Sequence, residues 1–303
     1  MARRIAPGTL VVLGVGGVIA AVAAAATTGL TVADSILLGL VEGITEFLPV
    51  SSTGHLTVAE RLLDIGRSGA ADKAAADAFA ICIQAGAILA VVVLYRTRLV
   101  SIVHGVIGRD RAGRHLVAVL LAAFVPAAVA GVLFDKKIEE HLFGVGPVLA
   151  AWAVGGLVIL AIAPRLRDGR RGLDTLTVRE GLIIGAAQAL ALWPGVSRSL
   201  VTILAALALG LALPAAVEFS FVLGFATLGA ATAYKALTDG HLIVDHFGVL
   251  SPLVGLAVAF VAAVVAVRWL VDYLNSHDLR VFGAYRLAIA AIGLALLAAG
   301  AFG

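Results

Sequence analysis

The chain has 303 residues, of which 61% are hydrophobic and only 14% are charged, and its formal net charge is +3. A mean hydropathy of +1.08 is higher than a water-soluble domain of this length shows, so the composition indicates an integral membrane protein. The positive charges form no basic tract interleaved with aromatic residues, which argues against a nucleic-acid partner.

Residues 1–30 have a basic start, an apolar run and a small-residue end, which fits either a signal-like segment or an extra transmembrane helix. The remainder, 31–303, is expected to form one membrane domain. Runs of apolar residues long enough to cross a bilayer as helices recur along the chain, and strand-like alternation is absent. The fold class is therefore predicted to be an all-α polytopic membrane protein. Seven full spans are predicted, at about 9–26, 77–95, 116–134, 147–163, 217–234, 249–271 and 284–302.

Two further apolar segments, 34–63 and 180–213, are interrupted by polar and helix-breaking residues. The first break follows Pro49, and the second contains Pro194 and Gly195. Irregular backbone at membrane depth is tolerated only where protein or a water-filled cavity surrounds it. Each segment is therefore predicted to be a re-entrant pair of half-helices.

Arginine-rich connections assign the sides of the membrane. Five arginines lie between 96 and 115 and five between 164 and 180, so both connections are predicted to be cytoplasmic loops. The connections after 134 and 234 are poor in lysine and arginine and are predicted to lie outside.

The two interrupted segments align at an offset of 146, which pairs Glu42 with Gln188 and Ser51 with Ser197. A similar span follows each, with Phe79 matching Phe219. The charge rule gives these spans opposite directions. The halves, about 34–163 and 180–302, are therefore predicted to form an inverted-topology repeat whose breaks meet near the membrane midplane.

The first break carries acidic, hydroxyl and imidazole groups. Glu42 and Glu46 are four residues apart and share one helical face, so their carboxylates repel unless a cation or a shared proton intervenes. The pattern favours a divalent metal or a proton relay, the alternative being simple pairing with an arginine. His55 follows a run of hydroxyl residues, which favours a catalytic or phosphate-contacting role over simple packing.

The second break places Arg198 at the predicted start of a half-helix, between Ser197 and Ser199. Helix N-terminal amides, hydroxyls and a guanidinium fork together suit phosphate oxygens. The alternative is that Arg198 only neutralises Glu42 or Glu46.

Taken together, "EGITEFLPVSSTGH" and "PGVSRSLVT" resemble the two signature motifs of the undecaprenyl-diphosphate phosphatase family, the bacitracin-resistance type of bacterial membrane enzyme. The stretches "IQAGAILAVVVLYR" and "LRVFGAYRLAIA" are also similar to the family, and the resemblance covers residues 31–300. It implies a multi-pass protein of the bacterial inner membrane. The implied activity is hydrolysis of undecaprenyl diphosphate to the monophosphate, which recycles the lipid carrier for peptidoglycan synthesis and confers bacitracin resistance. A divalent cation would assist, and the family suggests a homodimer.

The resemblance also implies a role for each site residue. Glu42 and Glu46 would hold Mg²⁺ or Ca²⁺ against the polyprenyl diphosphate. His55 would act as general acid, general base or nucleophile, with Ser52 as the competing nucleophile. Arg198 would be the catalytic arginine. The remaining hydroxyl groups expected to bind phosphate are those of Ser51, Thr53, Ser197, Ser199 and Thr202.

Two other functions compete with this interpretation. The pieces "SSTGH" and "SR" also resemble phosphatidic-acid-type phosphatases, but those enzymes need a histidine and an aspartate where this chain has Leu204 and Ala208. A transporter of an anionic lipid is the second alternative, because broken helices in an inverted repeat are usual in secondary transporters. The sequence leaves open the face to which the site opens.

Overall fold

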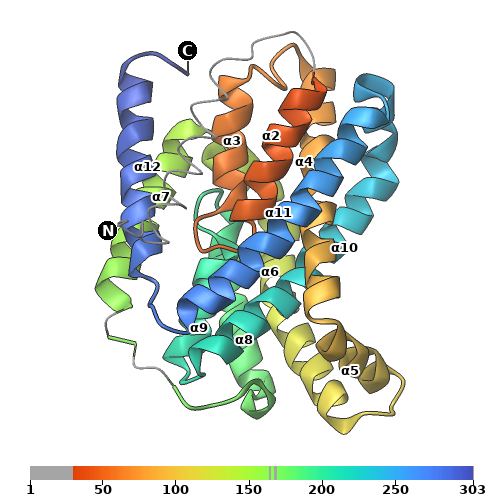
Figure 1. The fold of residues 1–303 in the computed structure, drawn as a ribbon, viewed down its shortest axis with the longest axis vertical. Coiled ribbons are helices and arrows are strands. Elements are labelled where there is room, and N and C mark those ends of the chain that lie inside the picture. The colour runs from red at the N-terminus through yellow and green to blue at the C-terminus, as the bar shows by residue number, and fades with distance from the viewer. Residues whose placement is uncertain (1–29, 164, 167–168, 303) are drawn as a thin grey trace, which may run out of the picture.

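The structure, a computed structural model, describes residues 30–163, 165–166 and 169–302 and is all-helical across them (Figure 1). Six helices of the described residues are long and apolar enough to cross a membrane, as predicted. The predicted span at 9–26, like nearly all of the N-terminal segment 1–30, lies outside the described residues. The spanning helices are α4 (Ala70–Leu94), α6 (Arg111–Leu142), α7 (Val145–Ile162), α10 (Leu213–Phe247), α11 (Leu250–Leu274) and α12 (Arg280–Ala298).

Two broken helix pairs enter the bundle from opposite ends, as the inverted repeat requires (Figure 1). The upper pair in Figure 1 is α2 (Val32–Thr45) and α3 (Ser52–Leu62). The lower pair is α8 (Val178–Ala189) and α9 (Arg198–Ala208), with the short helix η2 (Leu190–Leu192) between them.

Both pairs begin with the same helix cap. In α2 the Thr31 side chain accepts from the Asp34 backbone N–H, and the Asp34 carboxylate accepts from the Thr31 N–H. Thr177 and Glu180 form the same reciprocal cap on α8, at the offset of 146 that aligns the breaks. Such capping boxes satisfy two otherwise unpaired backbone groups each and fix where a helix begins.

The helices after the breaks also begin alike. Ser51 caps α3 and Ser197 caps α9, and both residues have positive φ angles, of 76° and 77°. Each hydroxyl accepts from the backbone N–H three residues on, that of Gly54 or of Leu200. A positive φ is costly for a residue with a side chain, so its occurrence at equivalent positions confirms the repeat beyond residue matching.

The halves exchange their re-entrant helices. Helix α2 of the first half packs along α11 of the second, and α8 of the second packs along α6 of the first. Equivalent glycines permit both contacts. A Cβ on Gly39 would lie 2.5 Å from the Gly255 carbonyl oxygen, and one on Gly185 would lie 2.9 Å from the Ala123 carbonyl carbon. Small residues at such contacts let two backbones approach closely in a membrane.

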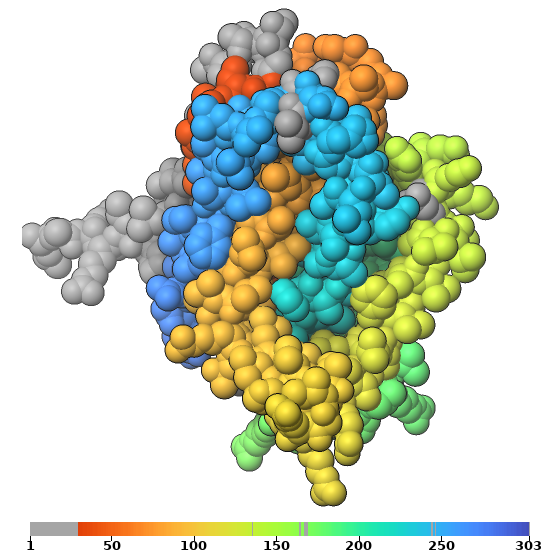
Figure 2. Space-filling view, turned by 90° about the vertical axis from the view of Figure 1, so that its right-hand side faces the viewer, coloured from red at the N-terminus to blue at the C-terminus, as the bar shows by residue number. Residues whose placement is uncertain are grey.

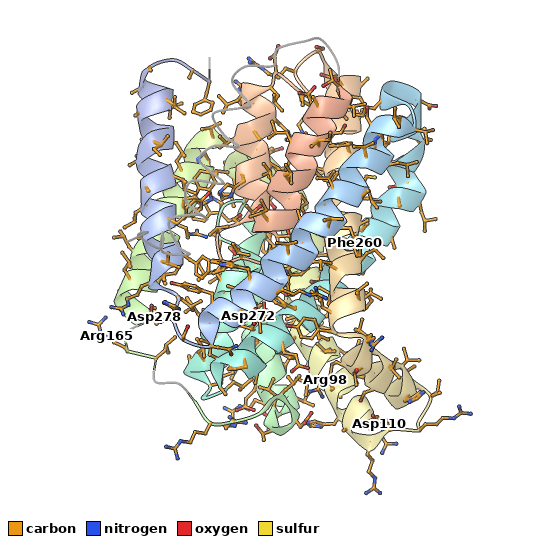
Figure 3. All side chains as sticks on the ribbon, in the orientation of Figure 1. Arg98, Asp110, Arg165, Phe260, Asp272 and Asp278 are labelled. Carbon is orange, nitrogen blue, oxygen red and sulfur yellow. The ribbon has the colours of Figure 1, made fainter. Side chains whose placement is uncertain are left out.

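The two arginine-rich connections lie at the same end of the bundle, where Arg98, Asp110 and Arg165 are found (Figure 3). Arg98 joins two parts of this end through ion pairs with Asp174 and Glu218, at 3.1 and 2.6 Å. This common end agrees with the predicted assignment of both connections to one side of the membrane.

The expectation that 96–115 is a loop is wrong, because α5 (Arg96–Val106) forms a helix that protrudes at this end with the start of α6 (Figure 2). Its apolar residues recur at helical spacing and are exposed. That spacing gives α5 one apolar face among its arginines, the pattern of a helix that lies at a membrane surface. The exposed apolar residues are Val100, Val103, Val106 and Ile107.

Candidate active site

A cavity of about 770 Å³ lies where the two breaks meet. Its walls come from both breaks and from α4, α6 and α10. The contact of α4 with α11 in one half of the repeat is equivalent to the contact of α10 with α6 in the other. The first pair packs closely, whereas α10, which lies between α4 and α6 (Figure 2), makes few contacts with α6. The cavity lies in the space that this leaves between α6 and α10. Of the predicted site residues, it is lined by Glu46, Ser51, Ser52, Thr53, Ser197 and Arg198.

The cavity extends toward the end of the bundle remote from the arginines. Its lining on α6 runs from Phe124 to Val132 and on α10 from Thr227 to Lys235, in each case beyond the first part of the helix. Both helices begin at the arginine-rich end, at Arg111 and Leu213. The break residues therefore connect to the half of the membrane opposite those arginines.

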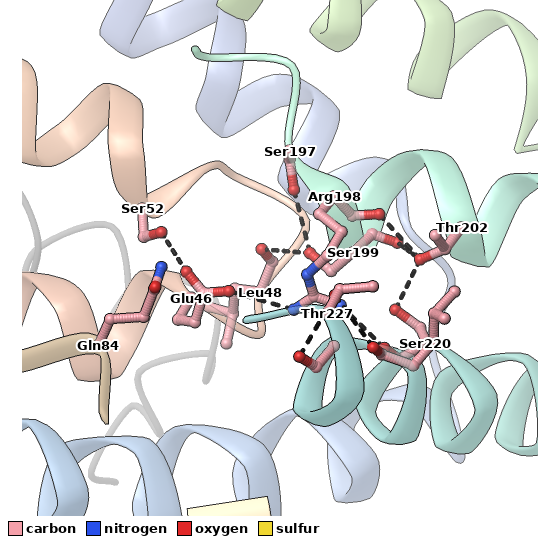
Figure 4. Close-up of polar contacts among 12 residues, drawn as sticks. Glu46, Leu48, Ser52, Gln84, Ser197, Arg198, Ser199, Thr202, Ser220 and Thr227 are labelled. Carbon is pink, nitrogen blue, oxygen red and sulfur yellow. Dashed lines mark hydrogen bonds and ion pairs between the residues drawn. The ribbon is translucent and has the colours of Figure 1, made fainter. Parts of the chain in front are cut away.

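Glu46 joins the two breaks (Figure 4). Its Oε2 accepts a hydrogen bond from the Ser52 hydroxyl, and its Oε1 forms an ion pair of 3.1 Å with Arg198 Nη2. The Glu46 and Arg198 side chains are 6% and 10% exposed, so water screens their charges little. A carboxylate beside a serine hydroxyl can take its proton, and a guanidinium beside both can stabilise negative charge.

Arg198 is held in place by its surroundings rather than by Glu46 alone. Nη1 donates to the Ser220 carbonyl oxygen at 2.8 Å, and the guanidinium carbon lies 5.9 Å from the centre of the Phe47 ring. Its Nε is buried and makes no hydrogen bond with the described residues. A buried guanidinium with an unused N–H is costly without a ligand, so the fork is suited to accept an anion such as phosphate.

Glu42 does not line the cavity; it is 1% exposed and interacts with the side chains of Glu46 and Ser52. Its Oε1 is buried and has no hydrogen-bond partner among the described residues. An unpaired carboxylate oxygen beside a second carboxylate fits a divalent cation. Since the described residues contain no cluster of three or more acidic, histidine or cysteine ligands, bound substrate would have to supply further oxygens.

Some of the hydroxyl residues predicted to bind phosphate line the cavity, and others do not. Ser51, besides capping α3, accepts from the Gly195 N–H at 3.2 Å and so links the two breaks. Ser199 and Thr202 do not line the cavity. The Ser199 hydroxyl donates to the Leu48 carbonyl at 2.9 Å, and that of Thr202 contacts the Ser220 hydroxyl at 2.7 Å. Ser199 therefore joins the second break to the first, and Thr202 contacts Ser220, whose carbonyl accepts from Arg198.

His55 is not among the cavity-lining residues either. It is 4% exposed, and both ring nitrogens are engaged: Nδ1 lies 2.6 Å from the Ser51 carbonyl oxygen and Nε2 lies 2.8 Å from the Tyr285 hydroxyl. The ring also packs 4.7 Å from that of Trp152, centre to centre. In this arrangement His55 positions the backbone of Ser51.

Arg286 is fully buried between the two breaks, and no motif in the sequence pointed to it. Among the described residues its guanidinium donates only to backbone carbonyls, and the shortest bonds are to Gly195 at 2.6 Å and Ala151 at 2.8 Å. Longer bonds reach Val196 at 3.3 Å and Pro49 at 3.4 Å, so both breaks are included. It supplies the donors that an interrupted helix inside a membrane lacks.

Sequence reasoning also missed polar groups on the cavity wall. Gln188 was noted only as the repeat partner of Glu42, and Gln84 lies in an otherwise apolar run. A lone polar residue in a spanning helix was the available signal, because such residues usually face the bundle interior. The additional polar lining residues are Gln84, Gln188, Thr227, Tyr234 and Lys235.

The fold and this cluster define a multi-pass α-helical membrane protein with a buried acid–serine–arginine site between re-entrant helices. A family model described as bacitracin resistance protein BacA matches residues 35–292, and the chain belongs to this family.

Curated relatives align over most of the chain. It is 48% identical over 265 residues to undecaprenyl-diphosphatase 2 of Rhodospirillum rubrum, and the alignment covers 86% of this chain and 92% of the relative. Over 266 residues it is 43% identical to the undecaprenyl-diphosphatase of Sorangium cellulosum, covering 86% and 85%. The undecaprenyl-diphosphatase of Deinococcus deserti is 41% identical over 270 residues, covering 88% and 95%.

The substitution Arg286→Met is expected to lower the free energy of unfolding by about 3–5 kcal/mol, because it keeps side-chain length but leaves several buried carbonyls unpaired. Thermal unfolding in detergent measures the change. Arg280→Met is the control on the same helix: that residue forms an exposed pair with Asp278, so its loss is expected to cost less than about 1 kcal/mol. Equal melting temperatures for the two variants would contradict the role assigned to Arg286.

Proposed function

We propose that this chain hydrolyses undecaprenyl diphosphate to undecaprenyl phosphate and inorganic phosphate. The observation that carries the proposal is the buried Glu46–Ser52–Arg198 cluster on the wall of an intramembrane cavity. The family and the names of the relatives support this substrate. We also propose the two consequences of that reaction, return of the lipid carrier to peptidoglycan synthesis and resistance to bacitracin.

Ser52 is the proposed nucleophile. Its hydroxyl already donates to Glu46 and faces the cavity, whereas both ring nitrogens of His55 are occupied away from it. Glu46 would take the Ser52 proton as Oγ attacks the terminal phosphorus. The bond to the bridging oxygen breaks, and its electron pair leaves with the lipid monophosphate. Water then hydrolyses the phosphoserine and releases inorganic phosphate.

Arg198 is the proposed phosphate clamp. Its position beside Ser52 and Glu46 would place the guanidinium against the equatorial oxygens of the transferring phosphoryl group, where negative charge is spread in the transition state. The Nε–H, which makes no hydrogen bond with the described residues, is available to the phosphate without breaking the existing contacts to Glu46 and Ser220.

Glu42 and Glu46 are the proposed ligands of a divalent cation, Mg²⁺ or Ca²⁺. When bound, the cation would neutralise charge on the diphosphate. The orphan oxygen of Glu42 supports this proposal, and with only two acidic ligands the ion would bind chiefly together with substrate.

The cavity is proposed to open to the outer face of the bacterial inner membrane. The charge rule places the arginine-rich end in the cytoplasm, and the cavity extends toward the other end. A homodimer, which the family suggests, stays a proposal. Small residues of α7 make a close contact within the chain: a Cβ added to Gly156 would lie 2.9 Å from the Gly283 carbonyl oxygen of α12.

Detergent-purified protein is expected to release inorganic phosphate from undecaprenyl diphosphate, and excess chelator is expected to stop the release until Mg²⁺ or Ca²⁺ is restored. Detergent micelles hold no gradient, so a protein that only transports the lipid, as broken helices in an inverted repeat would also allow, releases none. Full turnover in excess chelator would show that the reaction needs no divalent cation, and it would still support the proposed hydrolysis.

Ser52→Ala is expected to reduce kcat on the order of a thousandfold or more, because the nucleophile is lost. Tyr285→Phe removes only a hydrogen bond to His55 and is expected to cost about tenfold or less. Quenched reactions with labelled substrate provide the second measurement: a covalent phosphate stable to acid supports phosphoserine, and an acid-labile one would instead identify phosphohistidine.

Arg198→Lys is expected to slow turnover on the order of a hundredfold, or about 3 kcal/mol, while leaving the melting temperature near that of the wild type, since lysine keeps the charge but not the planar fork. Arg171→Lys is the matched control. Arg171 pairs with Glu180 outside the cavity, so that variant should lose stability and keep its turnover. Normal turnover with lowered stability in Arg198→Lys would make Arg198 a structural partner of Glu46 only.

A further inference from the structure

Gln84 lies on the cavity wall in the middle of α4, where its carboxamide extends toward Ser52 and Glu46 (Figure 4). No other helix of the first half brings a polar side chain to this wall among the described residues, apart from those at the break itself. A carboxamide in a spanning helix is costly unless its donors and acceptor are used, so its partners indicate its role.

The inverted repeat relates Gln84 to the position over which Arg198 lies. The breaks align at an offset of 146, which pairs Ser52 with Arg198. The following helices align at 140, because the first connection is six residues longer, and this pairs the buried Phe79 with Phe219 and therefore Gln84 with Gly224.

Gly224 leaves space for Arg198. A Cβ at this position would lie 2.5 Å from the guanidinium carbon and 2.6 Å from Nη2. In the second half, therefore, a long side chain from the break lies over a glycine of the spanning helix. In the first half the break supplies the short Ser52, and the spanning helix supplies the long Gln84. Each half thus brings one extended side chain with N–H donors to the same cavity.

Thr232 on α10 fixes the orientation of the Gln84 amide. Its hydroxyl donates to Gln84 Oε1 at 3.3 Å. This is the only hydrogen bond of the Gln84 side chain with the described residues, so the acceptor is used and the Nε2 hydrogens are not. The free groups are donors, which suit phosphate oxygens. A neutral amide can also stand near Glu46 without competing with Arg198 for its charge.

We propose that Gln84 Nε2 donates a hydrogen bond to an oxygen of the lipid-linked diphosphate, from the α4 side of the cavity, and that Thr232 is a positioning residue for it. This inference rests on the proposed function and names a substrate contact that the two signature motifs lack. It makes diphosphate recognition a joint property of the two repeat halves, with a cationic fork from one and a neutral amide from the other.

The test compares Gln84→Met, Gln84→Glu and Thr232→Val in the full-length purified chain. With undecaprenyl diphosphate, kcat/KM is expected to fall about 10- to 100-fold for Gln84→Met, since one hydrogen bond to a charged group is lost. The Gln84→Glu side chain still accepts from Thr232 but lacks the donors and adds a negative charge. Its loss of kcat/KM should therefore be larger and should diminish as pH is lowered.

Thr232→Val should lower kcat/KM about three- to tenfold. Thr238→Val, whose hydroxyl bonds the Lys235 carbonyl of its own helix and does not line the cavity, should stay within about twofold.

Binding is measured separately as the shift in melting temperature caused by inorganic diphosphate. The shift is expected in the wild type and is expected to be reduced in Gln84→Met, whatever the rate of hydrolysis. Near-normal kcat/KM in Gln84→Glu, or a lowered melting temperature with unchanged kcat/KM in Gln84→Met, would overturn the inference by showing a packing role. A wild type that binds diphosphate through Gln84 but releases no phosphate would overturn the proposed hydrolysis and leave this contact supported.

Discussion

The buried guanidinium of Arg286 is the contact on which the two breaks depend. A helix interrupted inside a membrane leaves carbonyl oxygens with no water to donate hydrogen bonds to them, and each such unpaired group is costly. Arg286 bonds to carbonyls of both breaks and to α7, so that one side chain from α12 satisfies groups far apart in the sequence. With the breaks held against each other, Ser51 and Ser197 can adopt their positive φ angles and begin α3 and α9 beside the same cavity.

The proposed active-site residues lie where the two halves differ. Caps, glycine contacts and strained serines repeat at equivalent positions and build the scaffold. The pairs that differ would carry the proposed chemistry: Glu46 corresponds to Leu192, and Ser52 to Arg198. The proposed base, the hydroxyl and the guanidinium therefore come together only because the halves are unequal. A strictly symmetric protein would place two acids or two arginines against each other, which like-charge repulsion disfavours.

Much of this was predictable from sequence because it follows from local chemistry. The length of the apolar runs predicted the spanning helices, and the arginine distribution predicted that the two arginine-rich connections lie at one end of the bundle. The paired motifs predicted that Glu46, Ser52 and Arg198 meet. Long-range orientation was not predictable. His55 is only two residues beyond the hydroxyl run, yet its ring contacts Tyr285 instead of the cavity. Ser199 and Thr202 contact Leu48 and Ser220 and do not line the cavity. Arg286 was missed because its partners are carbonyls, which leave no trace in side-chain patterns.

The cavity between α6 and α10 has a size typical of sites for small molecules, which is far too little for a long polyprenyl chain. For the proposed substrate, it would hold the diphosphate and the first part of the lipid, while the remaining tail would stay among the bilayer lipids. Encounter with the substrate is then a search in two dimensions, and the relevant abundance is the mole fraction of the lipid in the leaflet rather than its concentration in water. Added inert phospholipid at fixed total volume would therefore lower the reaction rate, because it lowers the mole fraction of the lipid substrate in the membrane. For a soluble enzyme, the same effect would require dilution of the substrate in water.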